Sequence, residues 1–326
     1  MRRHAAWLVL VLGASCGDDT TMQGDAAPSA WRLGPKIPAR RLEPGVTALG
    51  TQLVVLGGFD TGVSEGLHIT DAVDVFDTET ETWGPPLPPA PVQWSHIDLA
   101  SNGTTLFLLG GLEGEQFIAR GDAWALDAGA SAWRPLARLP AGLERGAAGV
   151  VSAPGHIYLL GGASTTDALA TCLDYDIAND SWTQLPALPG PRSHPAAMRT
   201  PDGTLLVAAG LRTIDSTKPL SDVLALPPGG TAWEPRTATL LVPRGGCAYG
   251  ALADQLICVG GESGNSALRG ADLYDASLDR WSSLELLPVN RAGTQGAAVG
   301  TRFYVPGGAP ALAYLPTDTL YIYSPP

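Results

Sequence analysis

The feature that most constrains the fold of this chain is a tryptophan that recurs at nearly even intervals along the sequence. Six tryptophans are spaced 48 to 52 residues apart, at Trp31, Trp83, Trp133, Trp182, Trp233 and Trp281. Apolar runs that end in glycine alternate with them, and these glycines are Gly57, Gly58, Gly110, Gly111, Gly161, Gly162, Gly210, Gly260, Gly261, Gly307 and Gly308. A fixed period of this length indicates a repeat architecture, in which each repeat is one small unit that packs against its neighbours.

Each repeat has the pattern of several short strands. Apolar runs of four to eight residues alternate with turn signals such as Asn102-Gly103 and Pro154-Gly155, as expected of half-buried strands joined by hairpins. An aromatic residue or a leucine stands seven residues before five of the tryptophans and marks a further strand. The 40 glycines and 28 prolines argue against long helices, because both residues are unfavourable in a helix interior.

This pattern resembles the kelch repeat, which forms one four-stranded blade of a β-propeller. The resemblance covers residues 31–323 and implies an all-β, six-bladed kelch-type propeller over residues 30–326. The first tryptophan has no glycine pair before it, and the last unit, Phe303 to Tyr323, has no tryptophan after it. We therefore expect the segment near Trp31 to supply the outer strand of the sixth blade, which closes the ring and leaves only short edges.

The N-terminus has the features of an export signal. Two arginines precede an apolar stretch over residues 5–12 that is too short to span a bilayer, and small residues lead to Cys16. This signal resembles that of bacterial lipoproteins, in which the cysteine is lipidated. It implies a signal peptide over residues 1–15, a lipidated Cys16, a flexible tether over residues 16–29 and an anchor in the cell envelope, at the periplasm or the cell surface. Gly13 stands where the lipoprotein signal usually has leucine, so ordinary cleavage and secretion are the alternative.

The charge of the chain excludes one class of partner. The formal net charge is −12, and only 20 residues are lysine or arginine. Nucleic-acid binding needs a basic surface that such a sequence does not supply. We expect a monomer whose partner is a protein or a glycan of unknown identity.

An arginine recurs before the inner strand of five repeats, in most of them 16 residues before the next glycine pair. These residues are Arg41, Arg145, Arg192, Arg244 and Arg291. Near the mouth of a propeller channel, their guanidiniums could attract an anion, or they could bond carbonyls and carboxylates of the blades as part of the repeat. The second repeat has Gln93-Trp94 instead, and we expect Trp94 and Trp124 to be exposed on a face rimmed by loops.

Two histidines share one position of the repeat. His96 and His194 occupy it in two repeats, and the others have Glu43, Ala147, Gly246 and Gly293. Imidazole and carboxylate groups are common metal ligands. Because Glu43 and the two histidines come from blades one, two and four, we do not expect them to converge. We predict that these residues lie at the start of strands near the channel mouth. We predict no metal site and no cofactor.

Cys247 and Cys258 fall on the first two strands of the fifth repeat. A hairpin centred on Ala253-Asp254 places Cys258 opposite Tyr249, so the two cysteines stand diagonally across the ladder. That arrangement favours buried small side chains over a disulfide, although a shift in register would allow the bond.

These features together fit a non-catalytic binding or scaffold lipoprotein that presents its loops to a protein or a glycan. The chain is also similar, in blade count and export signal, to the periplasmic kelch mutarotases and epimerases that act on sialic acids. That resemblance implies an arginine and an acidic residue near the channel, but no specific catalytic pair can be matched, so catalytic residues stay unknown. The sequence contains no nucleophile elbow, phosphate-binding loop or nucleotide fingerprint.

Overall fold

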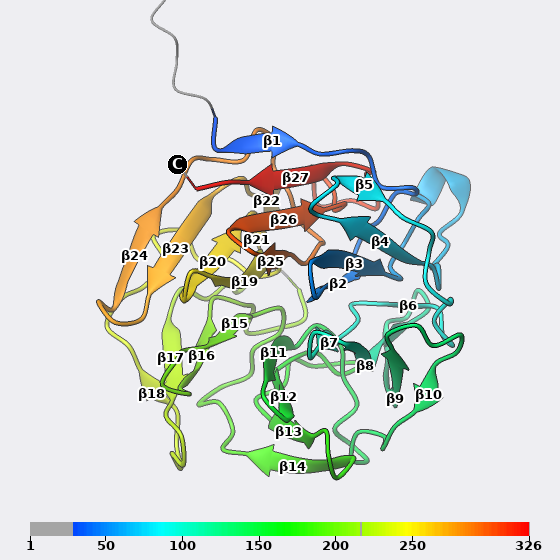
Figure 1. The fold of residues 1–326 in the computed structure, drawn as a ribbon. Coiled ribbons are helices and arrows are strands. Elements are labelled where there is room, and N and C mark those ends of the chain that lie inside the picture. Colours follow the sequence, from blue (N-terminus) through cyan, green and yellow to red (C-terminus); the bar gives the residue numbers. More distant parts are fainter. Residues whose placement is uncertain (1–28, 216, 326) are drawn as a thin grey trace, which may run out of the picture.

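The computed structural model describes residues 29–215 and 217–325, and these residues form six blade sheets around a central axis and one small two-stranded sheet (Figure 1). Blade 1 contains β2 (Gly45–Leu49), β3 (Gln52–Leu56), β4 (Val73–Asp77) and β5 (Thr82–Trp83). Blade 2 contains β6 (Trp94–Ser95), β7 (Leu99–Ser101), β8 (Thr105–Glu113), β9 (Ile118–Asp127) and β10 (Arg134–Pro135). Blade 3 contains β11 (Gly149–Ala153), β12 (His156–Leu160), β13 (Cys172–Asp176) and β14 (Ser181–Leu185).

The second half of the chain builds the other three blades in the same way. Blade 4 contains β15 (Ala196–Arg199), β16 (Leu205–Ala208), β17 (Val223–Leu226) and β18 (Glu234–Pro235). Blade 5 contains β19 (Ala248–Leu252), β20 (Gln255–Val259), β23 (Ala271–Asp275) and β24 (Arg280–Ser283), with the added hairpin β21 (Glu262–Ser263) and β22 (Ser266–Ala267). Blade 6 contains β25 (Ala297–Val299), β26 (Arg302–Pro306), β27 (Leu320–Tyr323) and β1 (Trp31–Leu33). A 3₁₀ turn, η1 (Val63–Glu65), lies in the loop between β3 and β4.

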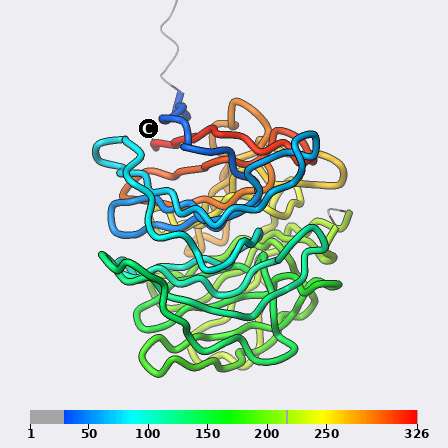
Figure 2. The backbone as a smooth tube through the Cα atoms, turned by 90° about the vertical axis from the view of Figure 1, so that its right-hand side faces the viewer, coloured from blue at the N-terminus to red at the C-terminus, as the bar shows by residue number. Residues whose placement is uncertain are grey.

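The strands of each blade are antiparallel, and the inner strand of each blade contacts the inner strand of the next around the whole ring. These inner strands are β2, β7, β11, β15, β19 and β25 (Figure 1). Seen from the side in Figure 2, the first and last blades lie together at one end of the molecule and the middle blades lie at the other. The six-bladed propeller predicted from the tryptophan repeat is confirmed.

The ring is closed by pairing between the two ends of the described chain. Strand β1 pairs antiparallel with β27, so that Trp31 lies opposite Tyr323. The two rings pack with their centroids 5.0 Å apart. The prediction that the segment near Trp31 forms the outer strand of the sixth blade is therefore confirmed.

The repeated tryptophans tie neighbouring blades together. Five of the six donate the indole N–H to a backbone carbonyl just after the outer strand of the preceding blade, at 2.8–3.1 Å, and the acceptors are Glu285, Pro35, Pro88, Ala137 and Pro186. The sixth, Trp281, has its Nε1 buried without a partner among the described residues. One large apolar cluster lies between each pair of adjacent blades. The core is thus divided into interfaces between blades, and the repeat tryptophans lie at its outer edge.

The glycine pairs allow a close approach between successive blades. At Gly161, a β-carbon would lie 2.3 Å from the carbonyl oxygen of Arg192, and φ is +67°. The neighbouring Gly162 donates its N–H to the same oxygen at 2.9 Å. Any larger residue would force the two blades apart, which explains why this position of the repeat is glycine.

The two cysteines of blade 5 form a disulfide bond. The predicted hairpin register is present, with Tyr249 opposite Cys258. The expectation that the diagonal placement disfavours a bond is wrong, because Cys247 precedes the first paired residue of β19 and its Cα lies 5.6 Å from that of Cys258. This separation is within the normal range for disulfides. The remaining described cysteine, Cys172, is buried and free.

Candidate functional site

Six equivalent residues of the repeat form a ring around the propeller axis. They are Glu43, His96, Ala147, His194, Gly246 and Gly293, and each has a φ between +51° and +66°. Five successive backbone hydrogen bonds link them around the ring. In the first, Glu43 N–H donates to the Gly293 carbonyl at 2.7 Å, and in the last, Gly246 N–H donates to the His194 carbonyl at 3.0 Å. Non-glycine residues seldom adopt this left-handed conformation, so its recurrence shows that the bonds between blades impose it. The ring brings together residues that are far apart in the sequence.

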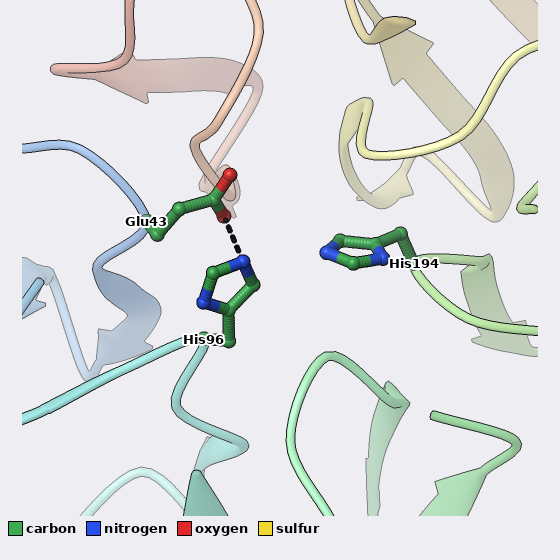
Figure 3. Close-up of side chains that lie close together, drawn as sticks. All are labelled: Glu43, His96 and His194. Carbon is green, nitrogen blue, oxygen red and sulfur yellow. Dashed lines mark ion pairs between the residues drawn. The ribbon is translucent and has the colours of Figure 1, made fainter. Parts of the chain in front are cut away.

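Three of the ring residues converge (Figure 3). Single ligand atoms of Glu43, His96 and His194 all lie within 4.8 Å of one another. The Nε2 atom of His96 is 3.5 Å from Oε2 of Glu43, and the two imidazole rings are 5.3 Å apart. The expectation that these side chains do not converge is wrong. Equivalent positions at the inner edge of the six blades all lie close to the propeller axis. Side chains from blades that are not adjacent can therefore meet there.

A serine before each histidine orients its imidazole. The Oγ atom of Ser95 is 2.9 Å from Nδ1 of His96, and it also faces the carbonyl of Leu112. The Oγ atom of Ser193 is 3.2 Å from Nδ1 of His194 and donates to the Thr213 carbonyl at 3.0 Å. A hydroxyl that donates its proton to a carbonyl can accept one from Nδ1–H. This arrangement leaves the Nε2 lone pair of each histidine free toward the axis.

Burial sets the charge of the cluster. It lowers the pKa of both histidines to about 4, with the neighbouring His96 lowering that of His194 further. Burial raises the pKa of Glu43, an effect that His194 opposes. It also raises the pKa of Glu262 to about 7, to which Glu43 and Asp215 add. At neutral pH the two imidazoles are therefore uncharged.

A cavity of about 250 Å³ opens above the cluster at the channel mouth. Its floor includes Glu43, His96 and Glu262, and its wall includes the rings of Phe117 and Tyr314. A hollow of about 30 Å³ extends from Glu43 and His96 toward His194. The cavity therefore has an apolar, aromatic wall and a polar floor.

Two side chains block the channel below this cavity. The hydroxyl of Tyr249 in blade 5 accepts the N–H of Val150 in blade 3 at 2.7 Å. Gln295 accepts from Val46 N–H and donates to the Ile97 carbonyl, both at 3.1 Å. A separate cavity of about 290 Å³ lies beyond Tyr249 and Gln295. The mouth cavity is thus a blind pocket, because these cross-links span the axis.

A larger groove of about 920 Å³ lies beside the mouth cavity. It is formed by the loop after Gly58 and by the second blade, and its lining includes Asp71, Glu113 and Glu115. Phe59 also lines it and packs edge-on against Phe117 and Tyr314 of the cavity wall, with centroids 6.3 and 5.3 Å away. One aromatic cluster therefore joins the two hollows, so a ligand longer than the cavity has an adjoining surface to occupy.

The recurrent arginines are not presented at the mouth. All five are at most 3% exposed, and none of them lines either hollow; they are Arg41, Arg145, Arg192, Arg244 and Arg291. Arg244 contacts Asp272 at 2.7 Å, and Arg192 contacts Asp222 at the same distance. Arg145 donates to the carbonyls of Gly161 and Thr171 in its own blade. The prediction of an anion-attracting ring is wrong: in five of the six blades, the guanidinium holds the start of the blade to other strands of the same blade.

Trp94 is also buried rather than exposed. It occupies the arginine position of the second repeat and is 2% exposed. Its ring packs against half-buried Trp124 with centroids 5.5 Å apart. The expectation of an exposed Trp94 is wrong because this large side chain fills the space that an arginine fills in the other blades.

Sequence reasoning missed Phe117, Glu262 and Tyr314 as residues of the cavity. Phe117 and Tyr314 lie in loops that differ in length between repeats, and the repeat pattern gives no position for them. Glu262 directly follows a glycine pair, and this was the available signal. Loops after glycine pairs reach the same face as the ring, so a carboxylate at that point can face the mouth.

Comparisons with known proteins agree with the fold. A family model described as "Kelch motif" matches residues 40–83. "Kelch-like protein terF" from Aspergillus terreus is 25% identical over 98% of this chain and 72% of its own length. An N-(sulfonatooxy)prop-2-enimidothioate sulfolyase from Thlaspi arvense is 28% identical over 51% of this chain and 49% of its own length. The solved structure titled "Structure of YjhT" superposes with a TM-score of 0.72 at 15% identity, covering 88% of this chain and 95% of that one. The described residues therefore form a six-bladed β-propeller of the kelch type, with a kelch motif at residues 40–83.

Proposed function

We propose that this protein is a non-catalytic binding protein that holds a neutral sugar unit of a glycan in the mouth cavity. The observation that carries the proposal is the blind cavity of about 250 Å³ with aromatic side chains on its wall and carboxylates on its floor. Small-molecule sites are typically concave and apolar, with a few polar groups that fix orientation, and span ~300–1,000 Å³. A cavity just below that range suits one ring-sized group, and the adjoining groove suits the rest of a chain of sugars.

The charges of the cavity favour a neutral ligand over an acidic one. Glu43 and Glu262 face the cavity, and its lining within the described residues contains no lysine or arginine. Sugar hydroxyls can donate to carboxylates and to unprotonated imidazole nitrogens. A sugar acid would instead place its carboxylate beside these groups, with no lysine or arginine of the described lining to pair with it. This is why we rank the alternative, an enzyme of the sialic-acid mutarotase or epimerase type, second.

We also propose that the protein is exported and anchored to the bacterial cell envelope through Cys16, which lies outside the described residues. The signal-like N-terminus supports this, and so does the disulfide between Cys247 and Cys258, since such bonds persist in oxidising compartments. None of the helices among the described residues is long and apolar enough to cross a bilayer. A Cys16→Ser variant should move from the membrane fraction to the soluble fraction. Its retention in the membrane fraction would count against the anchor.

Glycan binding can be measured as a shift of the melting temperature. A neutral sugar at 100 times its dissociation constant adds ~2.7 kcal/mol of stability, which corresponds to a few degrees for a domain of this size. We expect such a rise with neutral oligosaccharides, and we expect Tyr314→Ala to abolish it by removing part of the cavity wall. Leu315→Ala is the matched control, because Leu315 is the next residue, is 53% exposed and does not line the cavity. A rise with sialic acid that survives Tyr314→Ala would contradict the proposal.

A further inference from the structure

We propose that Glu43, His96 and His194 bind a divalent transition metal ion of the zinc type on the propeller axis. This inference goes beyond glycan binding and does not depend on it, because it rests on the ring and not on the cavity wall. It departs from the expectation from the sequence, which was that these residues form no metal site.

The donor set matches the chemistry of such ions. Two imidazoles and one carboxylate, with a further position left open, are a common set for zinc and related metals. The three ligand atoms lie within 4.8 Å of one another. Bonds of ~2.0–2.2 Å to one ion would require them to close to ~4 Å or less, which is a small rotation of the side chains. Figure 3 shows the three side chains extending toward one point from three blades.

The nitrogen atoms that would bind the metal have no competing partner. Neither Nε2 atom has a hydrogen bond to any described residue, and the 3.5 Å separation of His96 Nε2 from Glu43 Oε2 is long for one. Polar atoms this well enclosed normally have a partner, and the exposed fraction of the His96 side chain is only 10%. Two lone pairs directed at the same carboxylate therefore point to a cation between them.

Ser95 and Ser193 provide a second, independent observation. Both are fully buried, and each holds the Nδ1 atom of the following histidine. Metal-binding histidines characteristically donate the other ring N–H to an acceptor that fixes the tautomer and the ring orientation. The same serine–histidine pair occurs at the axis in two blades. Packing of a buried histidine alone does not require such a pair.

The cluster borders the mouth cavity of about 250 Å³ on one side and a hollow of about 30 Å³ on the other. Tyr249 and Gln295 close the axis below the cluster, whereas Glu43 and His96 face the mouth cavity together with Glu262. A metal held by three protein ligands has room for a further ligand on the side of the mouth cavity, whose lining includes Glu262.

Cobalt chloride is the direct probe, because tetrahedral or five-coordinate Co²⁺ absorbs visible light. Titration of the metal-free full chain should give one Co²⁺ ion per chain. His96→Ala and His194→Ala should each weaken binding at least 100-fold. Alanine is compatible with this backbone, since Ala147 occupies the equivalent ring position with a φ of +54°. His156→Ala is the control, because that imidazole contacts Asp174 in blade 3 and is not in the cluster, and it should leave binding unchanged.

Two further results decide the proposal. Ser95→Ala and Ser193→Ala should weaken Co²⁺ binding by ~10–100-fold while the stoichiometry stays at one, because they remove the contact that orients each imidazole but none of the three ligands. Equal melting temperatures of the metal-free variants would show that they are folded. A folded wild-type protein that binds no Co²⁺ would overturn the metal site, and so would binding that His194→Ala does not change. If neutral oligosaccharides did not raise the melting temperature of the wild-type protein, the proposed function would fail but this inference would not.

Discussion

Deleting residues 30–33 from the chain should abolish cooperative unfolding, because this segment contains all of β1 and closes the ring. Trp31 is 3% exposed and packs within the apolar cluster between blades 5 and 6. Its indole N–H donates to the Glu285 carbonyl at 2.8 Å, and its strand pairs with β27. Without β1, strand β27 becomes an exposed edge, and the sixth blade loses its contact with the end of blade 5. Loss of a buried tryptophan alone costs ~3–5 kcal/mol, a large part of a typical domain stability of ~5–15 kcal/mol.

Urea unfolding followed by tryptophan fluorescence and by circular dichroism measures this effect. The intact chain should give one sharp transition that is the same with both probes, and the deletion should give broad transitions that do not coincide. Leu33→Ala is the control, because Leu33 is 62% exposed and its backbone pairing is kept; its effect should stay within ~0.5 kcal/mol. A deletion variant that unfolds as sharply as the intact chain would refute closure by β1.

Arg244→Ala should destabilise the protein by ~3–5 kcal/mol without reducing glycan binding by the molecules that remain folded. Arg244 and Asp272 are 2% and 8% exposed, and their side chains meet at 2.7 Å. The guanidinium also donates to the Gly270 carbonyl at 3.1 Å. Removing one partner of a buried ion pair leaves the other charge without compensation, which accounts for the size of the effect.

Chemical denaturation of matched variants separates this structural role from a role in binding. Arg138→Ala is the control, because Arg138 pairs with Asp122 at the surface and is 63% exposed; its effect should be at most ~1 kcal/mol. The double variant Arg244→Ala with Asp272→Asn should recover part of the lost stability, since it removes the stranded charge. If Arg244→Ala were as stable as Arg138→Ala but had lost its ligand, the arginine would belong to the binding site after all.

The architecture could be predicted from the sequence because it is encoded in a repeated register. The tryptophans and the glycine pairs recur at fixed spacing, and each has a local reason that the structure shows: a bond from the indole to the preceding blade, and a close approach of the next blade. The closing strand followed from the incomplete repeats at the two ends. What a repeat pattern cannot give is the direction of a side chain relative to the axis.

The candidate site illustrates this limit. His96, His194 and Glu43 were recognised as equivalent in the repeat, yet their convergence depends on a left-handed backbone conformation that bonds between different blades impose. The register placed Trp94 at the position of the recurrent arginine, but the sequence did not show that this position is buried, so Trp94 was expected to be exposed. Phe117 and Tyr314 lie in loops outside the repeat, so no spacing rule could place them beside the cavity.

The central claim is that equivalent repeat positions converge in a closed pocket on the axis, and the nitrogen NMR spectrum of the imidazoles tests it most directly. With ¹⁵N-labelled histidine, His96 and His194 should both appear as neutral Nδ1–H tautomers at pH 6, with pKa values of about 4 because burial disfavours the charged ring. His68 and His156, which contact Asp60 and Asp174, provide reference signals from partly exposed positions. If His96 and His194 instead titrated near the ordinary value of ~6.5 as Nε2–H tautomers, they would not be enclosed and oriented as described, and the account of the site would be wrong.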